Sequence, residues 1–226
     1  RKLPRGALAG NRFTLVLRGF TGSREALERR VAEIAVEGVP NYFGPQRFGR
    51  ELGNLAVLRG EPVRGERGFA YSAARSLIFN AVLAERLAAG HWNRLLPGER
   101  ANLEGSNSTF RVEAIDETLR QRLAALDIHP TGPLWGEGES GVTGEVAELE
   151  SSVASRYTAL LELLRADRLA SARRPLRMVV RDLTLRWLHE ADACELQFSL
   201  RGGSFATTVV RELVHLDDAT GAEEHA

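Results

Sequence analysis

Residues 38–49 are Gly38-Val-Pro-Asn-Tyr-Phe-Gly-Pro-Gln-Arg-Phe-Gly49, which combine three glycines, two prolines and three aromatic residues in one short stretch. Proline fixes its φ angle, and glycine adopts φ angles that other residues avoid, so we expect a rigid loop with an unusual backbone here. Asn41, Tyr42, Phe43 and Phe48 place flat apolar faces beside hydrogen-bonding groups. This combination favours recognition of a planar, polar ligand such as a nucleobase.

A strand and a helix are expected to precede this loop. Residues 11–18 alternate enough between apolar and polar side chains to predict a strand. Ser23 can cap the helix that follows, and Gly38 ends it. We expect the loop to enter another strand at Tyr42–Phe43. The predicted inward residues are Phe13, Leu15 and Leu17 in the first strand, and Leu27, Val31, Ile34 and Ala35 in the helix.

The middle of the chain is predicted to be mostly helical. Residues 59–68 have the glycine, proline and charge content of a linker. Ser72 is expected to cap a helix that ends at Gly90, in which Asn80 is interpreted as a satisfied core or cap-contact amide rather than a catalytic group. Residues 143–164 predict the longest helix. The expected apolar stripes are Leu77, Ile78, Ala81, Val82, Ala84 and Leu87 in the first of these helices, and Val146, Leu149, Val153, Tyr157, Leu160, Leu161 and Leu164 in the second.

Between these two helices the pattern predicts shorter elements. Residues 101–113 indicate short strands around Gly105 and Asn107. Asp116 is expected to begin a helix that reaches about Leu126. The prolines and glycines of 129–136, His-Pro-Thr-Gly-Pro-Leu-Trp-Gly, argue against regular structure, so we expect an ordered loop there.

The C-terminal part returns to strands. Residues 177–188 and 193–200 predict two strands joined by a polar turn at 190–192. Ser204 is interpreted as the N-cap of a final helix. β-rich ends that bracket a helical middle are typical of a helical domain inserted into an α+β domain. The final helix is expected to carry Val209, Val210 and Leu213.

Composition sets loose limits on function. A chain of 226 residues with 43% hydrophobic residues can bury a sizeable core, and its formal net charge is zero. Residues 1–60 nevertheless hold eleven Lys and Arg against five Asp and Glu, which fits a local phosphate-facing surface or simply a solvated face. The single cysteine, Cys194, excludes an intramolecular disulfide and a multi-cysteine metal site. No apolar run approaches membrane-spanning length.

Residue chemistry alone yields no catalytic constellation. The five histidines lack metal-ligand spacing, and no phosphate-binding or dinucleotide-binding glycine loop is present. Ser204 follows two glycines, but Ala206 stands where a Gly-x-Ser-x-Gly nucleophile elbow needs its last glycine.

Several long motifs, in order along the chain, resemble the TruD family of tRNA pseudouridine synthases. They are residues 6–17 (Gly-Ala-Leu-Ala-Gly-Asn-Arg-Phe-Thr-Leu-Val-Leu), 38–49, 72–80, 129–136 and 203–213. The resemblance implies an α+β fold, with a pseudouridine-synthase-type mixed sheet and flanking helices interrupted by a mostly helical inserted domain. It implies a catalytic domain formed by 1–61 and 179–226, and an inserted TRUD domain at 62–178.

The resemblance also implies an activity. In this family an aspartate attacks the target nucleotide, the glycosidic bond breaks, and the uracil rotates and rejoins the ribose through carbon. The expected reaction is isomerisation of a uridine in the D-arm of tRNA, at position 13 in the family, with no cofactor and no metal. We expect a cytoplasmic monomer that binds tRNA and no membrane. The alternatives are a tRNA-binding module that retains the cleft without activity, and a protein-interaction scaffold.

Site residues follow by resemblance. Asn41 and Phe43 correspond to the family's active-site amide and stacking aromatic, and Phe205 to a second wall of the uridine pocket. Residues 41–43 and 203–205 are therefore expected to line one cleft. Arg47 and Arg211 are candidate contacts to the RNA backbone, although structural salt bridges explain them equally well. Core packing is the alternative for the two phenylalanines, and turn chemistry for Asn41.

The expected nucleophile does not match any residue of this sequence. The family's aspartate lies in a Gly-x-Lys-Asp type of motif, and no Lys-Asp pair occurs here. We therefore assign no catalytic residue within the chain and expect the nucleophile upstream of Arg1. The seven aspartates, none of which matches the motif, are residues 116, 127, 167, 182, 192, 217 and 218.

Overall fold

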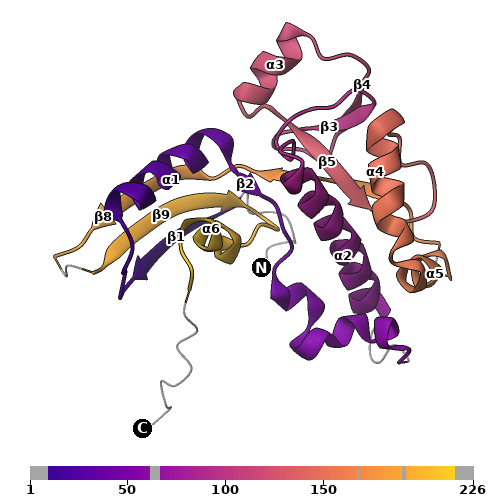
Figure 1. Ribbon diagram of the computed structural model, residues 1–226, viewed down its shortest axis with the longest axis horizontal. Helices are drawn as coiled ribbons and strands as arrows, with labels where there is room; N and C mark the ends of the chain where they lie inside the picture. Colours follow the sequence, from indigo (N-terminus) through magenta and orange to yellow (C-terminus); the bar gives the residue numbers. More distant parts are fainter. Residues whose placement is uncertain (1–9, 62–66, 167, 190–191, 217–226) are drawn as a thin grey trace, which may run out of the picture. The chain divides into compact units, whose positions relative to one another are not determined.

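The computed structural model describes residues 10–61, 67–166, 168–189 and 192–216 (Figure 1). The chain forms two compact units. Unit 1 combines residues 1–35 with 180–226, and unit 2 comprises residues 36–179. Helices and antiparallel sheets in both units confirm the α+β class. Residues 36–61 fall in unit 2, and the boundaries of the predicted catalytic and inserted domains stay predictions.

Unit 1 is built on a three-stranded antiparallel sheet in the order β1-β9-β8. Its strands are β1 (Gly10–Leu17), β8 (Arg181–Trp187) and β9 (Cys194–Arg201). The register pairs Phe13 with Phe198, and the two rings lie 5.4 Å apart. Every second residue of the central strand β9 is buried, from Cys194 to Leu200. The sheet therefore has one buried face, and the predicted inward residues of β1 lie on it.

Two helices complete unit 1. They are α1 (Arg24–Glu37) and α6 (Ala206–Leu213). Arg30 of α1 donates to the Glu212 carboxylate at 2.7 Å and to its carbonyl at 3.1 Å, which ties the two helices together. Ser23 accepts a hydrogen bond from the Ala26 N–H at 3.2 Å, which confirms the predicted N-cap. The helix ends before Gly38, whose φ of 74° is a left-handed conformation that favours glycine.

Unit 2 contains a four-stranded antiparallel sheet in the order β4-β3-β5-β6 and a two-stranded pair, β2 with β7 (Figure 1). Its helices are α2 (Arg67–Ala88), α3 (Glu117–Ala124), α4 (Gly144–Ser155) and α5 (Thr158–Ala166), with 3₁₀ segments η1 (Pro45–Phe48) and η2 (Arg50–Arg59). Its strands are β2 (Val39–Pro40), β3 (Glu99–Leu103), β4 (Thr109–Val112), β5 (Ile128–Leu134), β6 (Ala172–Pro175) and β7 (Arg177–Met178).

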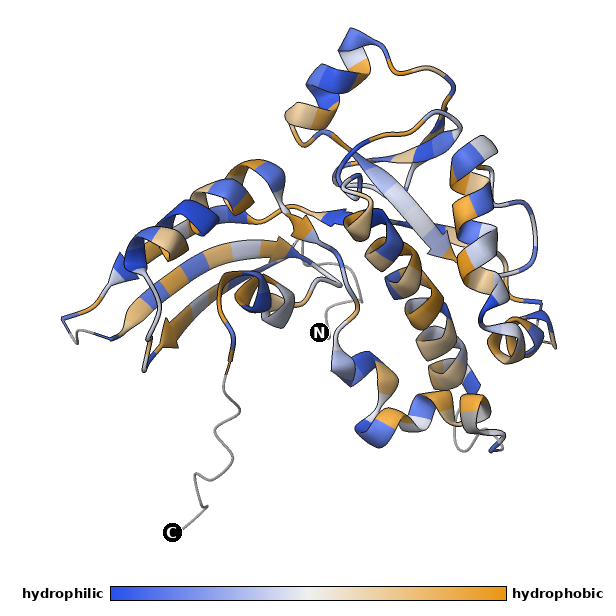
Figure 2. Ribbon diagram, in the orientation of Figure 1, coloured by the Kyte–Doolittle hydropathy of each residue, from blue (hydrophilic) through white to orange (hydrophobic). Residues whose placement is uncertain are grey.

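Helix α2 is the centre of unit 2 and packs on β5, α4 and α5. Its hydrophobic residues are drawn in orange in Figure 2. Ile78, Phe79 and Leu83 of α2 have no exposed surface. Leu160 and Leu164 of α5 are at most 1% exposed. Burial of this many large apolar side chains is the main stabilising contribution to the unit.

Two predicted elements of unit 2 are confirmed. The strands expected within 101–113 are β3 and β4. The helix expected from Asp116 is α3, and the Asp116 carboxylate accepts a hydrogen bond from the Leu119 N–H at 2.8 Å. This contact satisfies one of the N–H groups that a helix start leaves without a partner.

The loop predicted at 129–136 is wrong, because residues 128–134 form β5. The strand pairs with β3 only through Ile128–Pro130 and with β6 only through Thr131–Leu134. Neither half is paired on both sides, so the missing N–H groups of Pro130 and Pro133 are tolerated as on an edge strand. The pairing that makes this possible is long-range and has no local sequence signal.

Two predicted helix boundaries are also wrong. Helix α2 begins at Arg67 rather than after Ser72, because the extra turn buries Ala70 and Tyr71. The single helix predicted for 143–164 is two helices with a break after Ser155, so α2 is the longer one. Neither glycine nor proline marks that break, so the sequence contains no signal for it.

Two further local predictions fail. Tyr42–Phe43 does not begin a strand, since the preceding strand β2 ends at Pro40. Ser204 is not an N-cap, because Phe205 occupies that position and Ser204 instead donates its N–H to the Arg201 carbonyl at 3.2 Å. Residues 62–66 of the predicted linker and 190–191 of the predicted turn lie outside the described residues.

Candidate functional site

The loop after β2 carries the first two predicted site residues, and the pairing of β2 with β7 positions it. This pairing matches Val39 with Met178 and Pro40 with Arg177. The Asn41 N–H continues it by donating to the Leu176 carbonyl at 2.8 Å. The loop is thereby fixed against the segment that joins β6 to β7.

Asn41 is buried, with 6% of its surface exposed. Its Nδ2 donates to the Pro175 carbonyl at 2.8 Å, and its Oδ1 accepts from the Arg174 guanidinium at 2.6 Å. A carboxamide has two N–H donors and two acceptor lone pairs. Asn41 is thus held in one orientation and keeps one donor and one acceptor beyond these two contacts.

Phe43 lies next to Asn41 and is held through its backbone. Asn80 of α2 accepts from the Phe43 N–H at 2.9 Å and donates to the Phe43 carbonyl at 3.0 Å. Asn80 is therefore a satisfied amide in a structural contact, as predicted. The Phe43 ring is 8% exposed and packs edge-on against Phe79, with centroids 5.4 Å apart.

Two arginines approach the same ring. The guanidinium carbon of Arg174 is 4.2 Å from the Phe43 ring centroid, and that of Arg47 is 5.2 Å from it. Arg47 also donates to the Ser72 hydroxyl at 3.1 Å. We refer to Asn41, Phe43, Arg47 and Arg174 as the Phe43 cluster. Sequence analysis missed Arg174, although the consecutive arginines 173 and 174 ahead of a predicted strand were a signal available for it.

Burial dominates the electrostatics of this cluster. Burial and, to a smaller extent, the neighbouring charge of Arg47 together lower the pKa of Arg174 to about 10. The Arg174 guanidinium remains charged at neutral pH. The cluster therefore combines an oriented amide, an aromatic ring and two cations, which suits a planar base attached to a phosphate.

Phe205 and Arg211, the other predicted site residues, belong to unit 1. Phe205 is half-buried at the N-cap of α6, where its carbonyl accepts from the Thr208 N–H at 3.1 Å. Arg211 is exposed on the same helix. Phe205 and Arg211 lie in unit 1, whereas the Phe43 cluster lies in unit 2. A shared cleft for residues 41–43 and 203–205 therefore stays a prediction.

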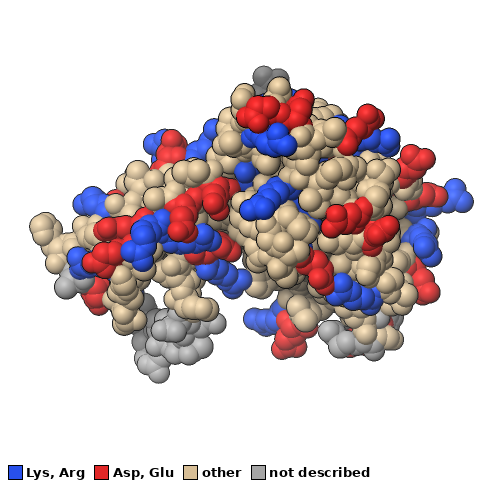
Figure 3. Space-filling view, turned by 45° about the horizontal axis from the view of Figure 1, so that its top comes forward, with Lys and Arg blue, Asp and Glu red and all other residues tan. Residues whose placement is uncertain are grey.

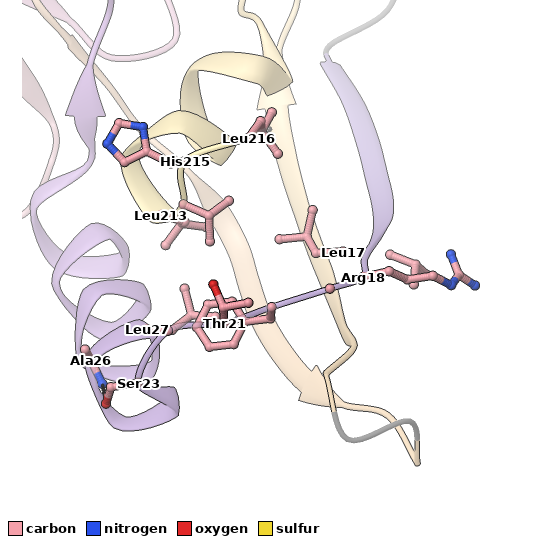
Figure 4. A pocket seen from close by; sticks show the side chains of 14 residues that line it. Leu17, Arg18, Thr21, Ser23, Ala26, Leu27, Leu213, His215 and Leu216 are labelled. Atoms are coloured by element: carbon pink, nitrogen blue, oxygen red, sulfur yellow. Dashed lines mark hydrogen bonds between the residues drawn. The ribbon is translucent and has the colours of Figure 1, made fainter. Parts of the chain in front are cut away.

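A cavity of about 590 Å³ lies within unit 1 between the β1–α1 connection and the segment after α6. Leu17, Leu27, Leu213 and Leu216 give it a largely aliphatic wall, and His215 stands at its border (Figure 4). A second cavity of about 550 Å³ in unit 2 is lined by Arg100, Glu139 and Arg173 among others. Neither cavity contains a predicted site residue.

The described aspartates have structural contacts. The Asp116 carboxylate caps α3, and that of Asp127 accepts from Arg122 at 2.6 Å. The Asp182 carboxylate accepts from the Ser199 hydroxyl at 3.1 Å, and the Asp192 carbonyl accepts from the Phe20 N–H at 2.9 Å. Within the described part of the chain, no aspartate takes part in the Phe43 cluster.

The face shown in Figure 3 carries no surface patch of one sign of charge. Basic and acidic side chains are interspersed on the face shown in Figure 3. Among the residues with described structure, no group of three or more His, Cys, Asp or Glu side chains is arranged to hold a metal ion. No helix in the described ranges has the length and apolar character needed to cross a membrane.

The chain matches the family model for tRNA pseudouridine synthase D (TruD) over residues 1–65 and 69–213. It is 46% identical over 228 residues to the tRNA pseudouridine synthase D of Nitrosococcus oceani, covering 98% of this chain and 64% of that protein. It is 45% identical over 224 residues to the tRNA pseudouridine synthase D of Methylococcus capsulatus, covering 96% and 63%. The chain thus spans less than two thirds of the length of these relatives.

The fold is also similar to a solved structure. A crystal structure of a Methanosarcina mazei protein assigned to tRNA pseudouridine synthase D (TruD) superposes with a TM-score of 0.69. The sequence identity is 21%, and the match covers 92% of this chain and 69% of that one. At this identity the likeness is evidence for the fold.

Proposed function

Because the chain belongs to the TruD family of tRNA pseudouridine synthases, we propose that the protein isomerises a uridine in the D-arm of tRNA to pseudouridine. The observation that carries this proposal is the match of the family model over nearly the whole chain. The Phe43 cluster adds support, because it gathers residues suited to a base and a phosphate around the loop at 38–49. The domains expected at 1–61, 62–178 and 179–226 belong to the same proposal.

Asn41 and Phe43 bind the uracil in this proposal. The edge of uracil carries an N–H donor flanked by carbonyl acceptors, which is complementary to the donor and acceptor that Asn41 keeps. Arg174 and the Pro175 carbonyl hold the amide in that orientation. Phe43 is mostly covered by protein, so only its small exposed part is left for the base. By resemblance to the family, Phe205 is proposed as a second wall of the uridine pocket.

The base must leave its stack to reach such a site, at a cost of a few kcal/mol. The contacts to Asn41, Phe43 and Phe205 offset that cost. Following the family, an aspartate attacks the nucleotide, the glycosidic bond breaks, and the uracil turns and reattaches through carbon. No aspartate of this sequence matches the family's Lys-Asp motif, so none is assigned as the nucleophile. The reaction needs no cofactor or metal, and a cytoplasmic, monomeric protein is part of the proposal.

A tRNA-binding module without activity is the alternative, and the same experiment separates the two. The protein as its gene encodes it is mixed with an unmodified tRNA transcript, and pseudouridine is located by chemical derivatisation and primer extension. The proposal predicts one modified uridine in the D-arm, and no product when that uridine is replaced by cytidine. Tight binding without any pseudouridine would support the alternative. Absence of both binding and product would reject both.

A further inference from the structure

We propose that Arg47 and Arg174 form a binding site for a backbone phosphate of the RNA, beside the Phe43 ring. This inference rests on the proposed function, in which the protein binds RNA. It adds a contact between the protein and an RNA phosphate. Both guanidinium carbons lie near one ring centroid, at 5.2 and 4.2 Å. Both cations therefore contact the same aromatic ring, and the charge of Arg47 acts on Arg174.

The described residues contain no carboxylate partner for these two arginines. In the described ranges, no carboxylate lies within ion-pair distance of either guanidinium group. The groups that accept from them are neutral, the Asn41 carboxamide for Arg174 and the Ser72 hydroxyl for Arg47. The Nε atoms of both arginines are buried without a hydrogen-bond partner. Both residues are partly buried, and cations withdrawn from water are normally paired, so this arrangement can accept an anion.

Two other arginines of unit 2, Arg86 and Arg173, have carboxylate partners, whereas the buried Arg177 donates to His129 and to two backbone carbonyls. Arg86 pairs with Glu99 at 3.2 Å, and both side chains are almost completely buried. Arg173, the residue next to Arg174, pairs with Glu150 at 2.6 Å. Arg174 thus differs from Arg173, its neighbour in the sequence, which has a carboxylate partner. Among the described residues, Arg86 and Arg173 thus have carboxylate partners, and Arg47 and Arg174 have none.

Phosphate is the anion that the chemistry favours. The planar guanidinium fork matches the oxygens of a phosphate group, and two such groups can share one phosphodiester. A nucleotide held by Asn41 and Phe43 brings its own phosphate close to the same ring. The charge of Arg47 contributes to the lowered pKa of Arg174, and a bound anion would relieve that repulsion.

The test measures the salt dependence of RNA binding. The dissociation constant of an unmodified tRNA transcript is determined from about 50 to about 300 mM NaCl for the protein as its gene encodes it. Arg174→Gln should weaken binding about tenfold at low salt and reduce the slope of log affinity against log salt by roughly 0.7–1. Arg120→Gln is the matched control, because Arg120 is an exposed arginine of unit 2 paired with Glu117. It should leave the slope unchanged.

Thermal unfolding of the free protein separates a ligand site from a structural one. Arg174→Gln removes a charge that has no carboxylate partner among the described residues, but also the hydrogen bond to Asn41, so its Tm should change little. Arg173→Gln breaks the pair with Glu150 and should lower the Tm by several degrees. The double variant Arg47→Gln with Arg174→Gln should lose less affinity than the two single losses combined, because both contact one phosphate.

An unchanged salt slope in folded Arg174→Gln would overturn the inference, and fully additive losses in the double variant would overturn the shared phosphate. If the wild type still converts the D-arm uridine in those cases, the proposed function stands without the phosphate site. A wild type that neither binds nor converts tRNA would instead reject the proposed function and this inference with it.

Discussion

Asn80 holds the backbone of Phe43 through both of its polar groups. Its Oδ1 accepts from the Phe43 N–H at 2.9 Å, and its Nδ2 donates to the Phe43 carbonyl at 3.0 Å. A single side chain of α2 thus fixes the loop on which the proposed base-binding residues lie. This relationship and the contacts around it lead to four predictions.

Asn80→Ala should lower the free energy of unfolding by about 1–3 kcal/mol, because it leaves two buried backbone groups without partners. Urea denaturation monitored by circular dichroism would measure the loss. Asn107→Ala is the control, since Asn107 is exposed, and it should stay within about 0.5 kcal/mol of the wild type. Equal stability of the two variants would show that the Asn80 contacts contribute nothing.

Phe43→Leu should affect both stability and turnover. The ring packs against Phe79 and Arg174, so its replacement should cost about 1 kcal/mol of stability. If the ring also contacts the uracil, single-turnover formation of pseudouridine should fall about tenfold or more. Phe79→Leu is the matched control, because Phe79 has no exposed surface. It should lose stability and keep normal turnover in the folded fraction, whereas equal turnover of the two variants would remove Phe43 from the pocket.

Phe205→Leu should leave stability nearly unchanged, because the side chain is only half-buried at the start of α6. As a wall of the uridine pocket, it should lower turnover about tenfold or more. Phe13→Leu is the comparison from unit 1, where Phe13 packs on Phe198 in the sheet. Its expected effect is a lower Tm with unchanged turnover per folded molecule. Normal turnover in Phe205→Leu would argue that Phe205 only packs.

The stability of the protein should fall between pH 7.5 and pH 5.5 because of His129. Burial lowers the pKa of this histidine. Its Nδ1 accepts from Arg177 Nε at 3.0 Å, so the ring is neutral and its Nε2–H faces Glu104 at 3.0 Å. The unfolded chain therefore binds a proton more readily below pH 6.5, and unfolding is favoured as pH falls, by at most about 1.4 kcal/mol per pH unit.

His129→Gln should reduce this pH dependence, which urea midpoints at the two pH values would reveal. His215→Gln, at an exposed histidine of unit 1, should retain it. His91 can add to the slope, because burial also lowers its pKa. A His129→Gln variant with the full wild-type slope would assign the effect to other groups.

Local signals in the sequence predicted the elements whose structure depends on near neighbours. Ser23 and Asp116 cap the helices that follow them, and Gly38 ends α1 in a conformation that favours glycine. The alternation of residues 11–18 predicted the inward residues of β1, which pair with the buried residues of β9. The motif at 38–49 indicated a base-binding loop and the family, because those residues are contiguous in the chain.

Only the tertiary structure determined what depends on distant pairing. Residues 128–134 form a strand despite two prolines, because β3 and β6 each pair with a different half of it. Arg174 reaches Asn41 and Phe43 across more than a hundred residues, through the pairing of β2 with β7. The local sequence of a strand does not specify which distant strand will pair with it. The sequence by itself therefore determined the family and the loop with Asn41 and Phe43. The fold determined that Arg47 and Arg174 lie on one ring with no carboxylate partner among the described residues.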